Sequence, residues 1–179
     1  MTQTHTLTAD QFARIGGERP CELIDGVVHE MTPAGYDHGW IAGNLHVLIG
    51  QHAMAKKLGR VCAAETGFLL ARDPDTVRAP DVSFVRAERS QAAEPGYFRG
   101  APDLAVEVVS PHDRVQDIND KVRAWLDAGT RLVWVIWPST RSVSVHRSAT
   151  TVETLAQTAT LDGDQVLPGF SCRVGEIFA

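Results

Sequence analysis

The sequence has few cysteines, few lysines and no long hydrophobic run, and each shortage argues against a class of protein. Its three cysteines are odd in number and far apart, which favours reduced thiols over a disulfide framework or a zinc site: Cys21, Cys62 and Cys172. The longest apolar run, residues 132–137, is far shorter than the roughly 20 residues of a membrane-spanning helix. Residues 1–5 lack the basic start and apolar stretch of a signal peptide. We therefore expect a cytoplasmic protein with no membrane partner.

Several signature motifs of enzymes are also missing. The chain has no G-x-S-x-G nucleophile elbow, no G-x-x-x-x-G-K phosphate loop, no G-x-G-x-x-G fingerprint and no H-E-x-x-H motif. These absences disfavour acyl hydrolases, NTPases, nicotinamide enzymes and zinc proteases. His46 and His52 are not four residues apart, so we expect no histidine metal site on their helix.

Positive charge is in short supply as well. The formal net charge is -5, from 17 lysines and arginines against 22 aspartates and glutamates. Proteins that bind nucleic acid usually carry a positive surface, because neutralising phosphates supplies much of their affinity. The charge balance therefore counts against a nucleic-acid partner unless arginines cluster locally.

The composition that remains is that of an ordinary globular protein, with 44% apolar and 22% charged residues. A length of 179 residues suits one domain, which we expect to span residues 1–179. A chain of this size can bury about 70% of the surface that its unfolded form exposes, enough for a core without disulfides.

The N-terminal third of the chain predicts a short helix, a hairpin and a long helix, over residues 8–15, 21–31 and 37–58. Gly16-Gly17 is expected to end the first helix, and Thr8 to cap its start. Asp25-Gly26 is a strong two-residue hairpin signal. Gly59 is well placed to end the long helix.

The rest of the chain alternates short strands with one further helix. Strands are predicted at residues 61–64, 68–70, 82–85, 104–109, 132–136 and 142–146. Residues 104–109 are apolar on both faces, which indicates a central strand, and a helix from Asp113 to Asp127 connects them to residues 132–136. Such a βαβ unit makes its two strands parallel or neighbouring. Residues 86–102 are expected to be a surface loop. We predict an α/β or α+β fold, with one mixed sheet and at least two helices packed on it.

Glu107 stands out because it lies in the middle of that apolar strand. An ionised carboxylate buried there costs several kcal/mol unless it is paired or binds a metal ion. Two structural alternatives remain open: the side chain could escape to solvent at the strand end, or it could pair with an arginine.

Asp81 follows Pro80 and opens a predicted strand 26 residues before Glu107. Pro-Asp is common in turns, so this residue alone says little. Two carboxylates on adjacent strands can share a divalent cation with water and phosphate oxygens, which is how Mg²⁺ is usually held. The pair therefore predicts a candidate site for Mg²⁺ or Mn²⁺.

Lys121 adds an amine to this constellation. It lies four residues after Asp117 on the predicted helix, which a surface ion pair would explain. However, the chain has only three lysines, and the other two are the adjacent Lys56 and Lys57. Lysine differs from arginine because it can lose its proton when partly desolvated, as a general base must.

His38 and Glu65 are weaker candidates for the same cleft. His38 lies near the start of the long helix, and Glu65 ends a predicted strand. Each is equally well explained as an exposed side chain. Glycines recur every four residues at Gly35, Gly39 and Gly43 and could let another backbone approach closely, and close packing is the first explanation for them.

Taken together, the motifs resemble the bacterial Uma-type family of restriction-endonuclease-like proteins, within the PD-(D/E)XK nuclease superfamily. The resemblance runs from about residue 20 to residue 147, the expected nuclease-like core. It is carried, in this order, by Glu22-Leu-Ile-Asp-Gly-Val-Val, His38, Pro80-Asp81-Val-Ser-Phe-Val, Pro102-Asp-Leu-Ala-Val-Glu107-Val-Val-Ser-Pro111, Asp117-x-x-x-Lys121 and Ala128-Gly-Thr-Arg-Leu-Val-Trp-Val-Ile.

The resemblance implies a Mg²⁺- or Mn²⁺-dependent endonuclease that hydrolyses phosphodiester bonds in DNA. Asp81, Glu107 and the carbonyl of Val108 match the metal ligands. The lysine of the superfamily normally stands two residues after the acid, where this chain has Val109, and Lys121 matches a displaced position on the next helix.

In the implied mechanism Lys121 deprotonates or orients the attacking water. Asp117 positions Lys121, and Glu65 or His38 assists through a water molecule. A homodimer is expected, because two cuts on a duplex suit a twofold protein. Two other functions stay open: a non-catalytic binding or assembly module that keeps the nuclease fold, and hydrolysis of another phosphoester or small molecule.

Overall fold

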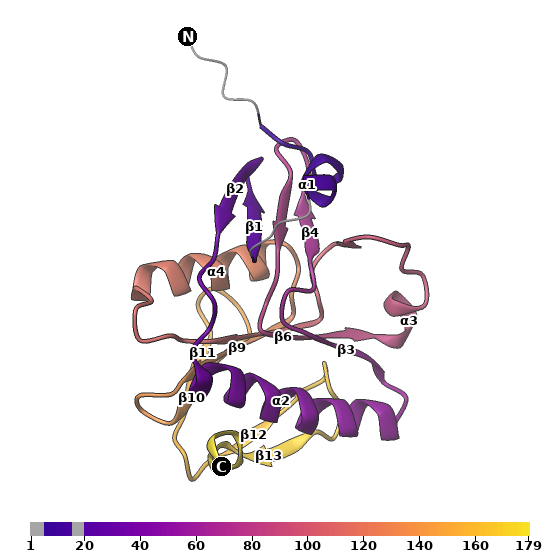
Figure 1. Cartoon of the computed structure of the whole chain (residues 1–179). Helices are drawn as coiled ribbons and strands as arrows, with labels where there is room; N and C mark the ends of the chain where they lie inside the picture. The colour runs from indigo at the N-terminus through magenta and orange to yellow at the C-terminus, as the bar shows by residue number, and fades with distance from the viewer. Residues whose placement is uncertain (1–5, 16–19) are drawn as a thin grey trace.

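The computed structural model describes residues 6–15 and 20–179, and its largest element is a six-stranded mixed sheet of order β11-β10-β9-β8-β6-β3 (Figure 1). Its strands are β3 (Gly59–Ala63), β6 (Val82–Arg86), β8 (Leu104–Val108), β9 (Leu132–Trp137), β10 (Ser142–His146) and β11 (Val152–Leu155). β8 and β9 are parallel and are joined through α4 (Val115–Asp127), and the other pairs are antiparallel. The expected βαβ unit and α+β fold are confirmed.

The two faces of this sheet are covered by different helices. α2 (Tyr36–Ala55) lies along one face and α4 along the other (Figure 1). Alternate residues of β8 point to opposite faces, so Leu104, Val106 and Val108 join the core beneath α2. Ala105 faces α4 instead, and the same alternation turns Glu107 toward α4. The core beneath α2 is completed by the C-terminal elements β12 (Thr160–Asp162), β13 (Ser171–Arg173) and η1 (Val174–Phe178).

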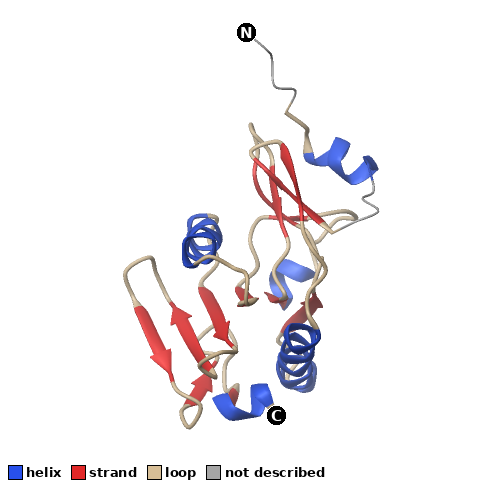
Figure 2. Cartoon of the chain, turned by 60° about the vertical axis from the view of Figure 1, so that its left-hand side comes forward, coloured by secondary structure: helices blue, strands red, loops and turns tan. Residues whose placement is uncertain are grey.

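A second sheet, of order β2-β1-β5-β4-β7, projects from the first on the side of α4 (Figure 2). It comprises β1 (Cys21–Ile24), β2 (Val27–Glu30), β4 (Phe68–Ala71), β5 (Thr76–Arg78) and β7 (Phe98–Arg99), with α1 (Ala9–Ile15) packed on it. The mixed sheet with flanking helices is confirmed. The expectation of one sheet was wrong, because this second sheet is present and β12 and β13 form a third. The central β5 has only three residues, too few to show a periodic pattern.

Most element boundaries follow the expected signals, with three corrections. The residues expected to form a surface loop, 86–102, contain α3 (Ala87–Ser90) and β7. α4 begins at Val115 rather than at Asp113, because the Asp113 carboxylate accepts the backbone N–H of Ser110 at 2.8 Å instead of capping the helix. α2 ends at Ala55, three residues early, and Lys57 takes a left-handed conformation with φ 54°.

The expected cap of α1 is confirmed. The hydroxyl of Thr8 accepts the backbone N–H of Gln11 at 3.2 Å, and the Gln11 side chain accepts the N–H of Thr8 at 2.8 Å. The expected end of this helix at Gly16-Gly17 lies outside the described residues. Among the helices in residues 6–15 and 20–179, none has both the length and the apolar character needed to cross a membrane.

Candidate active site

Glu107 is the centre of the candidate site. It lies on β8, which is flanked by β6 and β9, and only 2% of its surface is exposed. The ammonium of Lys121 donates to its Oε2 at 3.1 Å, and the indole N–H of Trp125 donates to its Oε1 at 2.8 Å. Lys121 and Trp125 are four residues apart on α4, so both project from one side of the helix onto the same strand. Each carboxylate oxygen therefore has one donor.

The pKa of Glu107 is raised from its ordinary 4.5 to about 7, chiefly by burial, and the charges of Asp81 and Glu22 act in the same direction. The ammonium of Lys121 and the hydrogen bond from Trp125 act in the opposite direction. The charge of Glu107 raises the pKa of Lys121 against the effect of burial. Lys121 is therefore an ammonium at neutral pH in this arrangement, and it donates a hydrogen bond to Glu107.

Asp81 stands immediately before β6, at the place where that strand meets the end of β8. Its backbone N–H donates to the carbonyl of Val106 at 3.1 Å, which continues the antiparallel pairing of the two strands. Its Oδ2 accepts the backbone N–H of Val108 at 2.7 Å. The expectation that Asp81 and Glu107 come from adjacent strands is confirmed. The two side chains lie near enough to each other for the charge of Asp81 to raise the pKa of Glu107.

His38, the third residue of α2, reaches the same place from the opposite side of the sheet. Its Nε2 lies 3.3 Å from Oδ2 of Asp81. The hydrogen bond to Asp81 is the main cause that raises the pKa of His38, and a backbone hydrogen bond to Val108 contributes, whereas burial lowers it. The imidazole thus contacts Asp81 and Val108, two of the three residues expected to bind a metal ion.

Glu22 is a site residue that the sequence analysis did not single out. It is 4% exposed on β1. Its Oε2 accepts Nη1 of Arg78 at 2.9 Å, and its Oε1 accepts the backbone N–H of Ala79 at 3.0 Å. Its charge raises the pKa values of both Glu107 and Lys121, so it lies within electrostatic range of them. The signal was available, because Glu22, like Glu107, is a lone acid within a short apolar strand.

Trp125 was missed for a different reason. It is fully buried and packs edge-on against Phe68, with ring centroids 6.2 Å apart, as a core tryptophan does. Only its spacing of four residues from Lys121, on the apolar side of α4, marks it as a second donor to the same strand.

Two expected site residues lie apart from this group. Asp117 is exposed, and no hydrogen bond or ion pair joins its carboxylate to another residue within 6–15 and 20–179. The expected contact between Asp117 and Lys121 was wrong, because Lys121 turns inward to Glu107. Glu65 is exposed in a turn with φ 67° and lines a cavity of about 170 Å³, where its carboxylate bonds to none of the described residues.

The donor chemistry of the site suits a hard divalent cation. Asp81, Glu107 and the carbonyl of Val108 supply oxygen atoms, which Mg²⁺ and Mn²⁺ prefer. The mutual repulsion of the two carboxylates is the kind that a cation relieves. In the described part of the chain, however, His, Cys, Asp and Glu side chains nowhere gather in a group of three or more able to hold a metal ion.

Comparison with known proteins identifies the family of this chain. The fold matches a crystal structure from Anabaena variabilis, described as "a putative nuclease belonging to DUF820", with a TM-score of 0.82 and 20% identity over 96% of this chain and 97% of that one. A search of curated proteins finds no match. Residues 9–175 match the profile of Uma2, described as "Putative restriction endonuclease". The chain therefore belongs to the Uma2 family.

Proposed function

We propose that this protein is a metal-dependent endonuclease that hydrolyses phosphodiester bonds in DNA. The observation that carries the proposal is Glu107, a buried carboxylate on a central strand that is held by an ammonium and an indole beside a second carboxylate. A buried acid with a strongly raised pKa and a specific charged partner is typical of a functional site. Membership of the family supports the reaction class.

Asp81, Glu107 and the carbonyl of Val108 are the proposed ligands of Mg²⁺ or Mn²⁺. When bound, the ion would lower the pKa of a coordinated water and polarise the scissile phosphate. For Glu107 to coordinate, its carboxylate must be ionised, and Lys121 together with Trp125 already stabilises that form. For Asp81 to coordinate, its carboxylate must give up or share the contact with His38 at 3.3 Å.

The proposed role of Lys121 follows from its charge. With its pKa raised by Glu107, the amine carries a proton at neutral pH and cannot accept one from water. We propose that it donates hydrogen bonds that orient the attacking water and stabilise the negative charge that develops on the phosphate oxygens. Its side chain is 30% exposed, so the ammonium can reach a substrate in front of the site.

His38 is proposed to hold Asp81 in place and to assist proton transfer through a water molecule. Glu65 remains a proposed assistant only if the substrate bridges to it, because no contact joins it to the described site residues. We further propose a homodimer, since cutting both strands of a duplex needs two sites. The three cysteines are free, which suits a reducing compartment such as the cytoplasm.

The test is cleavage of supercoiled plasmid with Mg²⁺ or Mn²⁺ by the wild type, Glu107→Gln and Lys121→Ala. We expect each variant to lose at least about 100-fold in rate, the order of magnitude for removing a preorganised electrostatic contact. Glu88→Gln and Arg123→Ala are matched controls, because both residues are exposed. Both should cut within about twofold of the wild type. Cleavage that persists in both site variants would point to a contaminating nuclease and remove the proposal.

A second candidate is a binding or assembly module that keeps the nuclease fold without its activity. Two observations favour it: the net charge of -5, and the side-chain partners His38 and Lys121, which already bond to the carboxylates of Asp81 and Glu107. Calorimetric titration with Mg²⁺, with and without duplex DNA, separates the two functions. Binding that Glu107→Gln removes supports the endonuclease, whereas the absence of any binding favours the module.

A further inference from the structure

The outward side of α2 carries apolar residues where a surface helix normally carries charge. Four large side chains are exposed, by 85% for Tyr36, 52% for Trp40, 53% for Val47 and 77% for Met54. Together with two glycines they form a row spaced alternately by four and three residues, here named the outer seam: Tyr36, Trp40, Gly43, Val47, Gly50 and Met54. This spacing keeps one side of a helix facing a partner helix along its whole length.

The glycines of this helix are not explained by the chain's own packing. A Cβ atom placed on Gly39, Gly43 or Gly50 would meet nothing within 4 Å. Packing within the described residues therefore does not account for the expected close approach at these glycines. A glycine inside a helix costs about 1 kcal/mol relative to alanine. Three of them above open space leave the helix backbone accessible to close approach by a partner.

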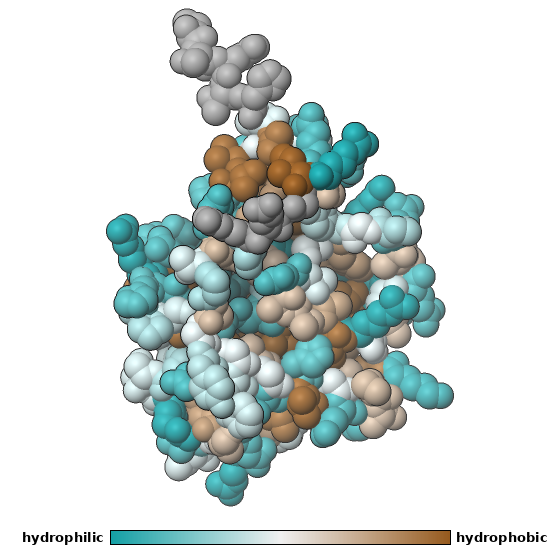
Figure 3. All heavy atoms as spheres, in the orientation of Figure 1, coloured by the Kyte–Doolittle hydropathy of each residue, from teal (hydrophilic) through white to brown (hydrophobic). Residues whose placement is uncertain are grey.

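The seam also lacks charge. After Asp37, α2 has no charged residue up to its end at Ala55, although 22% of the whole chain is charged. A surface that binds nucleic acid needs cations opposite the phosphates, so the seam does not suit DNA. Over α2, Figure 3 shows white and brown spheres interspersed with teal ones. A protein surface of similar apolar character is the fitting partner.

The order of residues along the seam is symmetric about Leu45. Tyr36 and Met54 are equally far from it, as are Trp40 and Gly50, and Gly43 and Val47. In an antiparallel pair of α2 helices centred there, Trp40 of one copy lies over Gly50 of the other, and Val47 lies over Gly43. Large residues thus meet small ones, which is how two helices fill their interface without voids.

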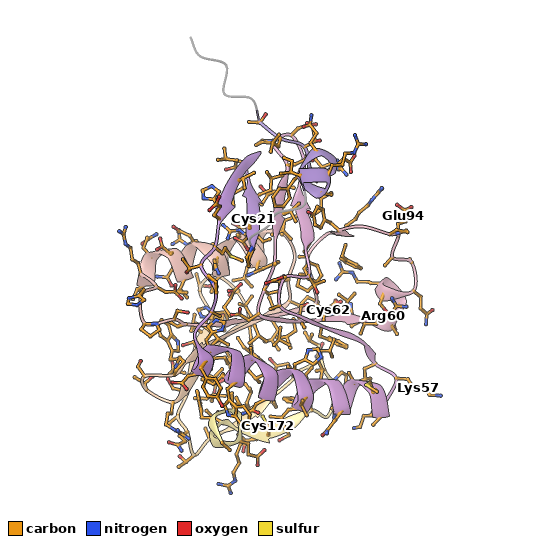
Figure 4. All side chains as sticks on the ribbon, in the orientation of Figure 1. Cys21, Lys57, Arg60, Cys62, Glu94 and Cys172 are labelled. Carbon is orange, nitrogen blue, oxygen red and sulfur yellow. The ribbon has the colours of Figure 1, made fainter. Side chains whose placement is uncertain are left out.

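The charges at the two ends of α2 fit the same arrangement. Asp37 is exposed at the N-terminal end, and Lys56 and Lys57 follow the C-terminal end. None of the three forms an ion pair with a residue in the described ranges. Figure 4 shows Lys57 pointing away beyond the end of the helix. An antiparallel copy brings Asp37 of one chain within about one turn of the lysines of the other.

We propose that the outer seam is the interface with a second copy of this chain, in which α2 packs antiparallel on its mate around a twofold axis at the height of Leu45 along the helix, on the side opposite to that buried residue. The contact is isologous, since the same residues serve both sides. Trp40 is already held in position, because its indole N–H donates to the backbone oxygen of Ala179 at 2.9 Å. The proposed interface does not depend on the proposed nuclease activity, because the experiment that tests it measures only the molecular mass of the protein in solution.

Sedimentation velocity of the wild type should give a dimer, and Val47→Arg should give a monomer with a dissociation constant at least about 100-fold higher. The reason is that the substitution buries an unpaired charge twice at the centre of the interface. The matched control is Val152→Arg, a valine 49% exposed on β11, which should remain dimeric. Circular dichroism checks that both variants are folded. A monomeric wild type, or a dimer that survives Val47→Arg, overturns the proposal.

A charge exchange tests the antiparallel orientation. Asp37→Lys alone should weaken dimerisation about tenfold, because it places like charges at both ends of the helix pair. Combining it with Lys56→Asp and Lys57→Asp should restore the wild-type dissociation constant, since the complementary charges are only exchanged. Failure of the combined variant to recover, or no change in the single variant, contradicts this orientation.

Discussion

The two ends of strand β8 each carry a buried carboxylate, and their partners differ. Asp103, just before the strand, is 1% exposed and accepts the backbone N–H of Arg86 at 3.0 Å. The guanidinium of Arg86 approaches at 3.1 Å and that of Arg89 at 3.0 Å. Guanidinium groups stay charged at any physiological pH and present several donors, so Asp103 is fully satisfied. It is a structural anchor.

Glu107, four residues further along, has the same burial but fewer donors. One ammonium and one indole N–H hold it, and neighbouring carboxylates raise its pKa further. The comparison teaches that burial of an acid does not by itself identify a site. What distinguishes Glu107 is that its pKa lies near neutral pH, so its carboxyl group can gain or lose a proton and thereby change its charge.

The largest effect expected is on the stability of Asp103→Ala. The change leaves Arg86 and Arg89 without their shared carboxylate and removes the acceptor of a backbone N–H. Because both guanidinium groups are more than a third exposed, water recovers part of the loss, and we expect about 3 kcal/mol. Urea unfolding measures it. A loss below about 1 kcal/mol would mean that Asp103 is not the anchor described.

The next effect in size is expected for Trp125→Phe. This change removes the donor to Oε1 of Glu107 and leaves a small void beside Phe68, so the free energy of unfolding should fall by about 2 kcal/mol. The pKa of Glu107 should rise, because the lost hydrogen bond stabilised the ionised form. Urea unfolding and a pH titration of the site measure both. A variant as stable as the wild type would show that the hydrogen bond from the indole to Glu107 does not contribute to stability.

A third prediction concerns the pH dependence of stability. The pKa of Glu107 is raised from 4.5 to about 7 on folding, so the folded protein holds a proton that the unfolded chain has released within that window. Stability from this group should therefore be complete below pH 4.5 and fall as the pH rises toward 7. The urea midpoint of the wild type relative to Glu107→Gln should show this decline. A constant difference between the two proteins would contradict it.

The smallest effect is expected for Asp117→Asn, at the exposed start of α4. Since this carboxylate contacts no other described residue, the variant should unfold within about 0.5 kcal/mol of the wild type. Its rate of plasmid cleavage should change by less than about twofold. A large loss of activity would restore the role that its spacing from Lys121 first suggested.

Local patterns predicted the elements that carry the site. The apolar strand around Glu107, the helix that follows it and the Asp25-Gly26 hairpin all depend on neighbours in sequence, and all are present. β5 and the second sheet were not predictable in this way. β5 pairs with β1 from more than fifty residues away, at Leu23 and Val77, and no local signal encodes that contact.

The site divides in the same manner. Asp81 and Glu107 could be paired from sequence, because each begins or occupies a strand with a clear signal. The partner of Lys121 could not, since the choice between Asp117 and Glu107 depends on the side to which the helix turns. Glu22 reaches the site from the other sheet, where it pairs with Arg78 of the neighbouring strand β5, a contact that exists only after β1 and β5 have come together.

α2 is one uninterrupted helix that holds His38 against Asp81 near its start and presents Val47 outward nine residues later. The rotational phase between these two positions is therefore set by residue count alone. A single residue inserted between them would rotate the distal part of the helix by about 100° relative to the histidine. Insertions or deletions between His38 and Val47 should consequently be far less tolerated than substitutions.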